Sequence, residues 1–147
     1  YKTSNFEGYD ISKKNLEKCK SYSIKNDLEI NLHNSHPNKK YDIVLLINVI
    51  EYAIDKEFII RNVINLLKRE GLLIISLANP SHPFISNIYI RSLITGRSID
   101  DIRKSEPNSY ITYSDLNKLI SKYANIKLLK KNYSLSRLNI NLVYKGL

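Results

Sequence analysis

The sequence is short of several residues that would point to particular classes of protein. Its one cysteine, Cys19, excludes an internal disulfide and offers no metal-ligand spacing, so we expect no metal site. No run of 18 or more apolar residues appears, which excludes a membrane-spanning helix. The N-terminal stretch YKTSNFEGYD lacks the features of a signal or transit peptide. We therefore expect the protein to reside in the reducing cytoplasm.

Methionine is absent, even at position 1, and both ends of the 147-residue chain fall within sequence that looks structured. We therefore expect that Tyr1 is not the native start and that residues 1–147 form a single, partial domain. Hydrophobic residues make up 43% of the chain, which is enough for a chain of this length to bury a core.

The net charge of +9 raises the possibility of a nucleic-acid partner. Lysine is far more abundant than arginine (17 against 6), and isoleucine (22) and asparagine (17) are also frequent. These residues have A/T-rich codons, so the bias is typical of an AT-rich genome. The lysines are also scattered along the chain. We therefore favour solvated surface lysines over a nucleic-acid groove, without excluding the groove.

The centre of the chain has the pattern of a strand, a helix and a second strand. Residues 41–50 (YDIVLLINVI) are apolar at nearly every position, as in a parallel strand buried on both faces. Asp55 can cap the following helix, in which Lys68 and Arg69 would occupy the last turn and Gly71 the left-handed C-terminal position. A second buried strand follows at 72–77, completing a βαβ unit.

The flanking segments complete an α/β pattern. A short apolar stretch at 6–11 precedes a helix that Ser12 caps and that runs to about Lys20, and residues 28–32 form a possible strand. Pro80, Pro83 and Pro107 interrupt the segment after the core, which holds one predicted helix, 84–95, closed by Gly96. Ser114 is predicted to cap a further helix, and 125–129 and 138–144 to form an antiparallel strand pair at the edge of the sheet.

Four motifs in this order resemble a known family. They are Gly8-Tyr9-Asp10-Ile11-Ser12, the stretch from Tyr41 through Asn48-Val49-Ile50-Glu51-Tyr52, the stretch Leu66–Leu77 with Asn79-Pro80, and Tyr113-Ser114-Asp115-Leu116. The ordered set resembles the class I S-adenosylmethionine-dependent methyltransferases. The resemblance implies their Rossmann-like fold, a mostly parallel sheet flanked by helices with an antiparallel C-terminal strand pair. It also implies an N-terminal truncation and a substrate-lid-like insertion at 80–112.

The resemblance implies three residues that contact the cofactor and one residue, Ile11, beside them. Asp10, followed by Ile11, matches the acid that accepts the ribose hydroxyls of S-adenosylmethionine, although a turn or helix-capping role would also explain it. Asn48 follows a buried strand, at the sheet edge where open α/β folds bind ligands. Asn31 is the best candidate for the residue beside adenine. The family's first strand and glycine-rich loop have no counterpart among the four glycines, so we expect this chain alone to bind the cofactor poorly and to be inactive.

Methyl transfer from a sulfonium mainly requires that nucleophile and methyl group be held close and aligned. His82 is the histidine best placed by the resemblance to act as a general base, although a surface-loop histidine explains it as readily. Tyr52, where many relatives carry histidine, Asn79 and Arg91 are the candidate acceptor-binding residues. Tyr89, Arg97 and Tyr110 are further candidates for a polar pocket, and packing or solvated charge would account for them equally well.

The predicted function is methyl transfer to an oxygen or nitrogen atom of a small molecule or glycan. A nicotinamide dehydrogenase would share the βαβ core, but its usual all-parallel sheet fits the late strand pair less well. A non-catalytic, degenerate binding domain and an RNA methyltransferase remain alternatives. The sequence does not identify the oligomeric state.

Overall fold

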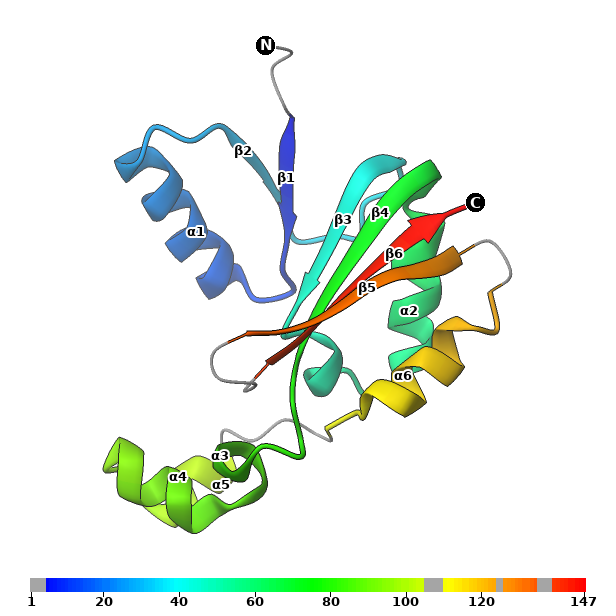
Figure 1. The fold of residues 1–147 in the computed structure, drawn as a ribbon. Helices are drawn as coiled ribbons and strands as arrows, with labels where there is room; N and C mark the ends of the chain where they lie inside the picture. Colours follow the sequence, from blue (N-terminus) through cyan, green and yellow to red (C-terminus); the bar gives the residue numbers. More distant parts are fainter. Residues whose placement is uncertain (1–4, 105–109, 124–125, 135–138) are drawn as a thin grey trace. The chain divides into compact units, whose positions relative to one another are not determined.

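The computed structural model describes residues 5–104, 110–123, 126–134 and 139–147 (Figure 1). The chain divides into two compact units, residues 1–39 and residues 40–147, and each is described by itself. Three expectations fall on residues outside the described ranges: the starts of the last two strands, at 125 and 138, and the break at Pro107. Among the described residues, no helix is long and apolar enough to cross a membrane.

The first unit is a strand, a helix and a parallel strand. Its elements are β1 (Phe6–Tyr9), α1 (Lys13–Lys25) and β2 (Ile30–His33). The predicted cap is confirmed, because the Ser12 hydroxyl accepts a hydrogen bond from the Asn15 N–H at 3.4 Å. The helix ends at Lys25 rather than near Lys20. No glycine or proline stops it earlier, and Asp27 then takes a left-handed conformation with φ of 52°.

The second unit contains a four-stranded sheet with the order β3-β4-β6-β5. The strands are β3 (Tyr41–Ile47), β4 (Leu67–Ala78), β5 (Ile126–Ser134) and β6 (Asn139–Gly146). β3 and β4 are parallel, and β6 is antiparallel to both of its neighbours. The short helix η1 (Ile50–Tyr52) and α2 (Lys56–Asn65) connect β3 to β4. The α/β class and the late antiparallel pair are confirmed.

Two helices cover one face of this sheet, α2 and α6 (Tyr113–Ile120), as Figure 1 shows. Their apolar residues pack against alternate residues of three strands and form the core: Val44, Leu46, Ile60, Ile64, Leu73, Ile75, Leu77, Leu116, Ile120, Ile140, Leu142 and Tyr144. The predicted burial of residues 41–50 on both faces is wrong. Ile43, Leu45 and Ile47 are 55%, 61% and 48% exposed, since they point away from the face that the two helices cover.

The junction between α2 and β4 also differs from the prediction. α2 ends at Asn65, so Lys68 and Arg69 belong to β4, and Glu70 rather than Gly71 takes the left-handed conformation, with φ of 65°. Gly71 has a different role. A Cβ there would lie 2.9 Å from the Lys68 carbonyl oxygen and 3.1 Å from that of Tyr41. A glycine is needed because backbone segments approach closely, not because of its φ.

The segment after β4 forms three short helices, α3 (Pro83–Ser86), α4 (Ile88–Thr95) and α5 (Ile99–Lys104). The single predicted helix at 84–95 is therefore wrong. Asn87 divides it, because its side-chain oxygen accepts from the N–H groups of Tyr89 and Ile90 and caps α4. The predicted left-handed end at Gly96 is confirmed, with φ of 65°. The helix α5 was not predicted from the sequence.

Candidate active site

A cavity of about 730 Å³ lies at the carboxyl end of β4, within the second unit. Open α/β sheets bind ligands outside the carboxyl ends of their strands, so this is the expected place for a site. The cavity is lined by the loop after β4, the start of α6 and one residue from each of β5 and β6: Asn79, Pro80, Ser81, His82, Pro83, Thr112, Tyr113, Ser114, Lys131 and Ile140.

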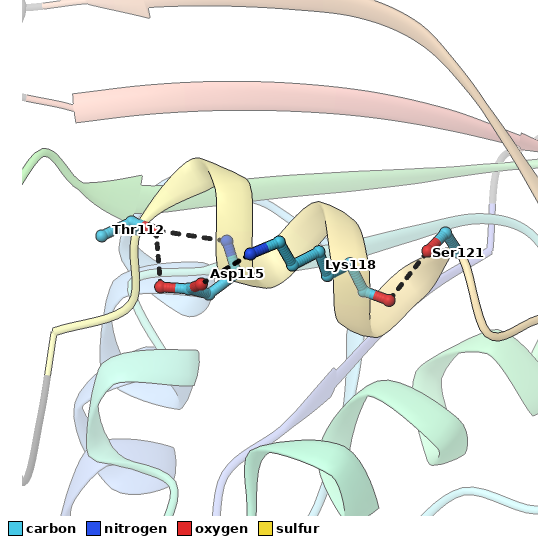
Figure 2. A network of polar contacts seen from close by, with 4 residues as sticks. All are labelled: Thr112, Asp115, Lys118 and Ser121. Carbon is cyan, nitrogen blue, oxygen red and sulfur yellow. Dashed lines mark hydrogen bonds and ion pairs between the residues drawn. The ribbon is translucent and has the colours of Figure 1, made fainter.

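The start of α6 is held by the side chain of Thr112, shown in Figure 2. Its hydroxyl oxygen accepts from the Asp115 N–H at 3.1 Å, and the hydroxyl donates to the Asp115 carboxylate at 2.7 Å. Lys118 lies 3.9 Å from the other carboxylate oxygen of Asp115. The predicted cap at Ser114 is wrong, because the cap is Thr112, two residues earlier in the chain, whose side chain satisfies the free N–H of Asp115. This start places Tyr113 and Ser114 at the cavity.

The loop after β4 brings two of the predicted residues to the cavity. The Asn79 side-chain oxygen accepts from the Ser81 N–H at 3.2 Å and shapes the turn. His82 caps α3, and its Nδ1 accepts from the Phe84 N–H at 3.1 Å. In the neutral ring Nε2 therefore carries the hydrogen and is a donor. The assignment of His82 as a general base stays a prediction.

Lys131 also lines the cavity, and no pattern in the sequence predicts this. In a regular strand, Lys130 would share a face with Leu128. The register instead shifts after Leu128, so that Lys130 pairs with Val143 and Lys131 pairs with Leu142. This β-bulge turns Lys131 toward the covered face of the sheet. Its Nζ lies 3.8 Å from the centre of the Tyr113 ring.

The other predicted acceptor-binding residues do not line this cavity. Tyr52 is 57% exposed in η1. Arg91 on α4 donates from Nη1 to the Tyr110 hydroxyl at 3.4 Å, and Arg97 donates to the Asp101 carbonyl oxygen at 2.8 Å. Both arginines therefore make contacts within the 80–112 segment. Their predicted role with the acceptor stays a prediction, as does that of Tyr52.

Three of the predicted cofactor residues lie in the first unit. Asp10 follows β1 and is half-buried, and its two oxygens accept from the Ser12 N–H at 2.8 Å and from the Asn15 side-chain amide at 3.0 Å. These bonds stabilise the start of α1. A carboxylate can accept about four hydrogen bonds, so Asp10 can accept further ones from ribose hydroxyls. Its chemistry therefore fits the ribose of S-adenosylmethionine. Ile11 is 84% exposed, and Asn31 is exposed on β2.

Asn48 lies at the end of β3 in the second unit. It adopts a left-handed conformation with φ of 49°, and its N–H donates to the Ser76 carbonyl oxygen at 2.8 Å. Asparagine is among the few residues that tolerate this conformation. The backbone bond anchors Asn48 to β4 and leaves the residue exposed, so that its amide is accessible to a ligand.

Glu51, which the sequence motifs contained without a role, is a buried carboxylate with 2% exposure. Its Oε1 accepts from the Ala78 N–H at 2.5 Å and so joins η1 to the end of β4. Its Oε2 has no hydrogen-bond partner among the residues that the structure describes. In the sequence, Glu51 could have been singled out because it is an acidic residue directly after a long apolar stretch.

Comparisons with known proteins agree with this architecture. A sequence model of a methyltransferase domain family matches residues 2–73. The chain is 35% identical over 77 residues to the ubiquinone biosynthesis O-methyltransferase of Pelagibacter ubique, covering 49% of this chain and 32% of that protein. It is 31% identical over 98 residues to the protein of the same name from Rickettsia typhi, covering 63% of this chain and 40% of that protein. The chain thus spans well under half the length of these relatives.

The fold is similar to that of solved methyltransferases. The structure of an S-adenosylmethionine-dependent methyltransferase from Clostridium acetobutylicum superposes with a TM-score of 0.68 at 15% identity, covering 97% of this chain and 75% of that one. At this identity the similarity concerns the fold, whereas the matches in sequence concern the family. Residues 2–73 are thus similar in sequence to a methyltransferase domain family, and the chain has the fold of S-adenosylmethionine-dependent methyltransferases.

Proposed function

We propose that the full-length protein transfers the methyl group of S-adenosylmethionine to an oxygen atom of a small-molecule acceptor. The match of residues 2–73 to a methyltransferase domain family supports the reaction class, and the names of the two curated relatives support an oxygen acceptor. The observation that carries the proposal is the cavity at the carboxyl end of β4. Its volume of about 730 Å³ is within the range of small-molecule sites.

The cofactor brings an activated methyl group, because its sulfonium is already a good leaving group. Bound S-adenosylmethionine would supply the methyl carbon to the acceptor oxygen and leave as the neutral thioether, and the hydroxyl proton of the acceptor would pass to solvent or to a base. The residues of the chain then have to hold the acceptor in line and exclude water. The cavity residues suit this task, since they combine apolar surface with hydroxyl, amide and cationic groups.

The cofactor-binding roles are part of the same proposal. Asp10 would accept the ribose hydroxyls, with Ile11 beside it, and Asn48 would contact the methionine end of the cofactor. Asn31 would lie beside adenine. The spare acceptor capacity of Asp10 and the exposed, anchored position of Asn48 support these roles.

The test is a transfer assay on the full-length protein. Labelled S-adenosylmethionine is incubated with small hydroxylated and aminated acceptors, and the products are analysed by mass spectrometry and NMR to locate the new methyl group. We expect methyl ethers. Products methylated only on nitrogen would refute the oxygen assignment. A protein that neither binds S-adenosylmethionine nor transfers its methyl group to any acceptor would refute the proposal as a whole.

A further inference from the structure

Glu51 is a buried carboxylate at the carboxyl edge of the sheet. Its side chain is 2% exposed. Its Oε1 accepts a hydrogen bond from the Ala78 N–H at 2.5 Å, and its Oε2 has no hydrogen-bond partner among the residues that the structure describes. Burying a carboxyl group with incomplete hydrogen bonding is unfavourable. The stability of the fold alone therefore does not account for a glutamate here, and such exceptions to local rules are expected at functional sites.

The hydrogen bond of Glu51 joins two loops that both belong to the candidate site. The parallel ladder of β3 and β4 ends at Ser76, whose carbonyl oxygen also accepts from the Asn48 N–H at 2.8 Å. Glu51 reaches two residues further along β4, to Ala78. Ala78 is the last residue of β4, and Asn79 begins the loop that lines the cavity. The bond thus holds the end of β4 against the turn that follows β3.

These two loops carry the two sides of the proposed reaction. Asn48 lies on the turn after β3 and is proposed to contact the methionine end of the cofactor, whereas Asn79 and His82 lie on the loop after β4 and line the cavity. Methyl transfer requires the methyl group and the acceptor oxygen to be close and in line, and a displacement of about 1 Å can lower the rate about a hundredfold. A buried side chain that fixes one loop against the other supplies such alignment.

We infer that Glu51 is a positioning residue for methyl transfer, which holds the loop of residues 79–82 at a fixed spacing from the turn that carries Asn48. The inference rests on the proposed function and adds a residue that acts through the backbone of Ala78, without touching either substrate. The length of the side chain is decisive in this arrangement, because Oε1 has to reach the Ala78 N–H from η1. The charge is not decisive, because an amide oxygen accepts from the same N–H.

The experiment separates length from charge in the full-length protein. Glu51→Gln keeps the length and the acceptor oxygen and removes the charge, whereas Glu51→Asp keeps the charge on a side chain one carbon shorter. Ile64→Val is the control, because Ile64 is also buried in the second unit but lies near the end of α2, beside the amino end of β4. The kcat and the KM for S-adenosylmethionine are measured with the acceptor that the transfer assay identifies. Thermal melting gives the folded fraction of each variant.

We expect Glu51→Gln and the control to keep kcat within about threefold of the wild type, per folded molecule. Glu51→Asp should lower kcat about tenfold or more while the KM for S-adenosylmethionine changes less than about threefold. A wild-type kcat in Glu51→Asp would overturn the inference, because the spacing of the loops would then not depend on the length of the side chain. A kcat as low in Glu51→Gln as in Glu51→Asp would also overturn it, because the charge would then be the decisive property.

A second readout does not depend on methyl transfer. The backbone amide signals of Asn79, Ser81 and His82 are compared by NMR, and they should move in Glu51→Asp and keep their positions in Glu51→Gln. A wild-type protein that transfers no methyl group would refute the proposed function, whereas unmoved signals in folded Glu51→Asp would refute the inference. If Glu51→Asp does not fold, Glu51→Gln decides: a lowered kcat or moved loop signals overturn the inference, and retention of both supports it.

Discussion

Individual residues in the second unit carry unusual polar environments, and Tyr144 is the clearest case. Its side chain is 1% exposed, and its hydroxyl has no hydrogen-bond partner among the described residues. Leaving such a hydroxyl unsatisfied costs about 1–3 kcal/mol. We therefore predict that Tyr144→Phe raises the free energy of unfolding by about 1 kcal/mol, measured by urea denaturation at pH 7. A loss of 1 kcal/mol or more would show that the hydroxyl has a partner.

The same residue gives a prediction about pH. Burial, reinforced by the nearby Tyr113, raises the pKa of Tyr144 above the ordinary value of about 10. Above that pH the unfolded chain releases the phenolic proton while the folded protein retains it, so the unfolded state binds fewer protons and stability falls as pH rises. The stability of the wild-type protein should therefore fall more steeply between pH 9 and 11 than that of Tyr144→Phe. Parallel curves would contradict this.

His82 has two candidate chemical roles, that of a general base and that of a hydrogen-bond donor to the acceptor. A general base contributes typically about 10²–10⁴-fold to the rate, whereas a donor to the acceptor mainly affects binding. Asparagine can replace the capping function of Nδ1 but has no group at the position of Nε2, so His82→Asn separates the two roles. We predict a KM for the acceptor raised about tenfold, with kcat changed by less than about fivefold. A kcat lowered a hundredfold at unchanged KM would instead show that His82 is the base.

Local rules explain which residues the sequence could predict. Ser12 and Asp55 cap their helices as expected, because a side-chain oxygen before a helical pattern acts within three residues. Gly96 ends α4 as expected, because glycine readily takes the left-handed conformation. Lys131 could not be predicted, because its direction depends on a bulge whose position is set by pairing with β6, and no short sequence pattern encodes that pairing.

At the scale of elements, the βαβ unit was predictable but the end of its helix was not. The apolar periods of residues 41–77 identify two strands and a helix. The limit between α2 and β4 depends instead on contacts with distant backbone, since Leu67 pairs with Tyr41 and Gly71 lies against the carbonyl oxygens of Tyr41 and Asp42. A glycine pattern alone cannot separate a left-handed helix end from close packing of the backbone.

This distinction can be tested at Gly71. Its Cβ would lie 2.9–3.2 Å from three backbone carbonyl oxygens, which cannot move independently of the sheet. We predict that Gly71→Ala lowers the free energy of unfolding by about 1–3 kcal/mol, as overpacking does. The control is Gly8→Ala, whose nearest contact at 2.9 Å is the end of the flexible Leu32 side chain. Denaturant unfolding that shows a smaller loss for Gly71→Ala than for Gly8→Ala would contradict this account.

At the scale of the whole molecule, the resemblance to methyltransferases was visible in sequence because the motifs that carry it are local and ordered. Asp10, Asn48 and Asn79 directly follow β1, β3 and β4, and the motifs that carry the resemblance placed them at strand ends, whereas the strand patterns alone ran on to residues 11 and 50. The cavity at the carboxyl end of β4 was not predictable, because its lining comes from four separated segments and its cation from a bulge. The open face of β3 was also missed, since an apolar run does not reveal which face neighbouring helices cover.

The central claim is that this chain contributes Asp10 to a site for S-adenosylmethionine, and calorimetric titration of the full-length protein tests it most directly. Asp10→Asn keeps an acceptor for the Ser12 N–H but removes the charge, and Glu29→Gln, an exposed residue before β2, is the control. We predict micromolar binding by the wild type and Glu29→Gln, and binding about tenfold or more weaker for Asp10→Asn. Unchanged affinity in Asp10→Asn, or no binding by the wild type, would contradict the account.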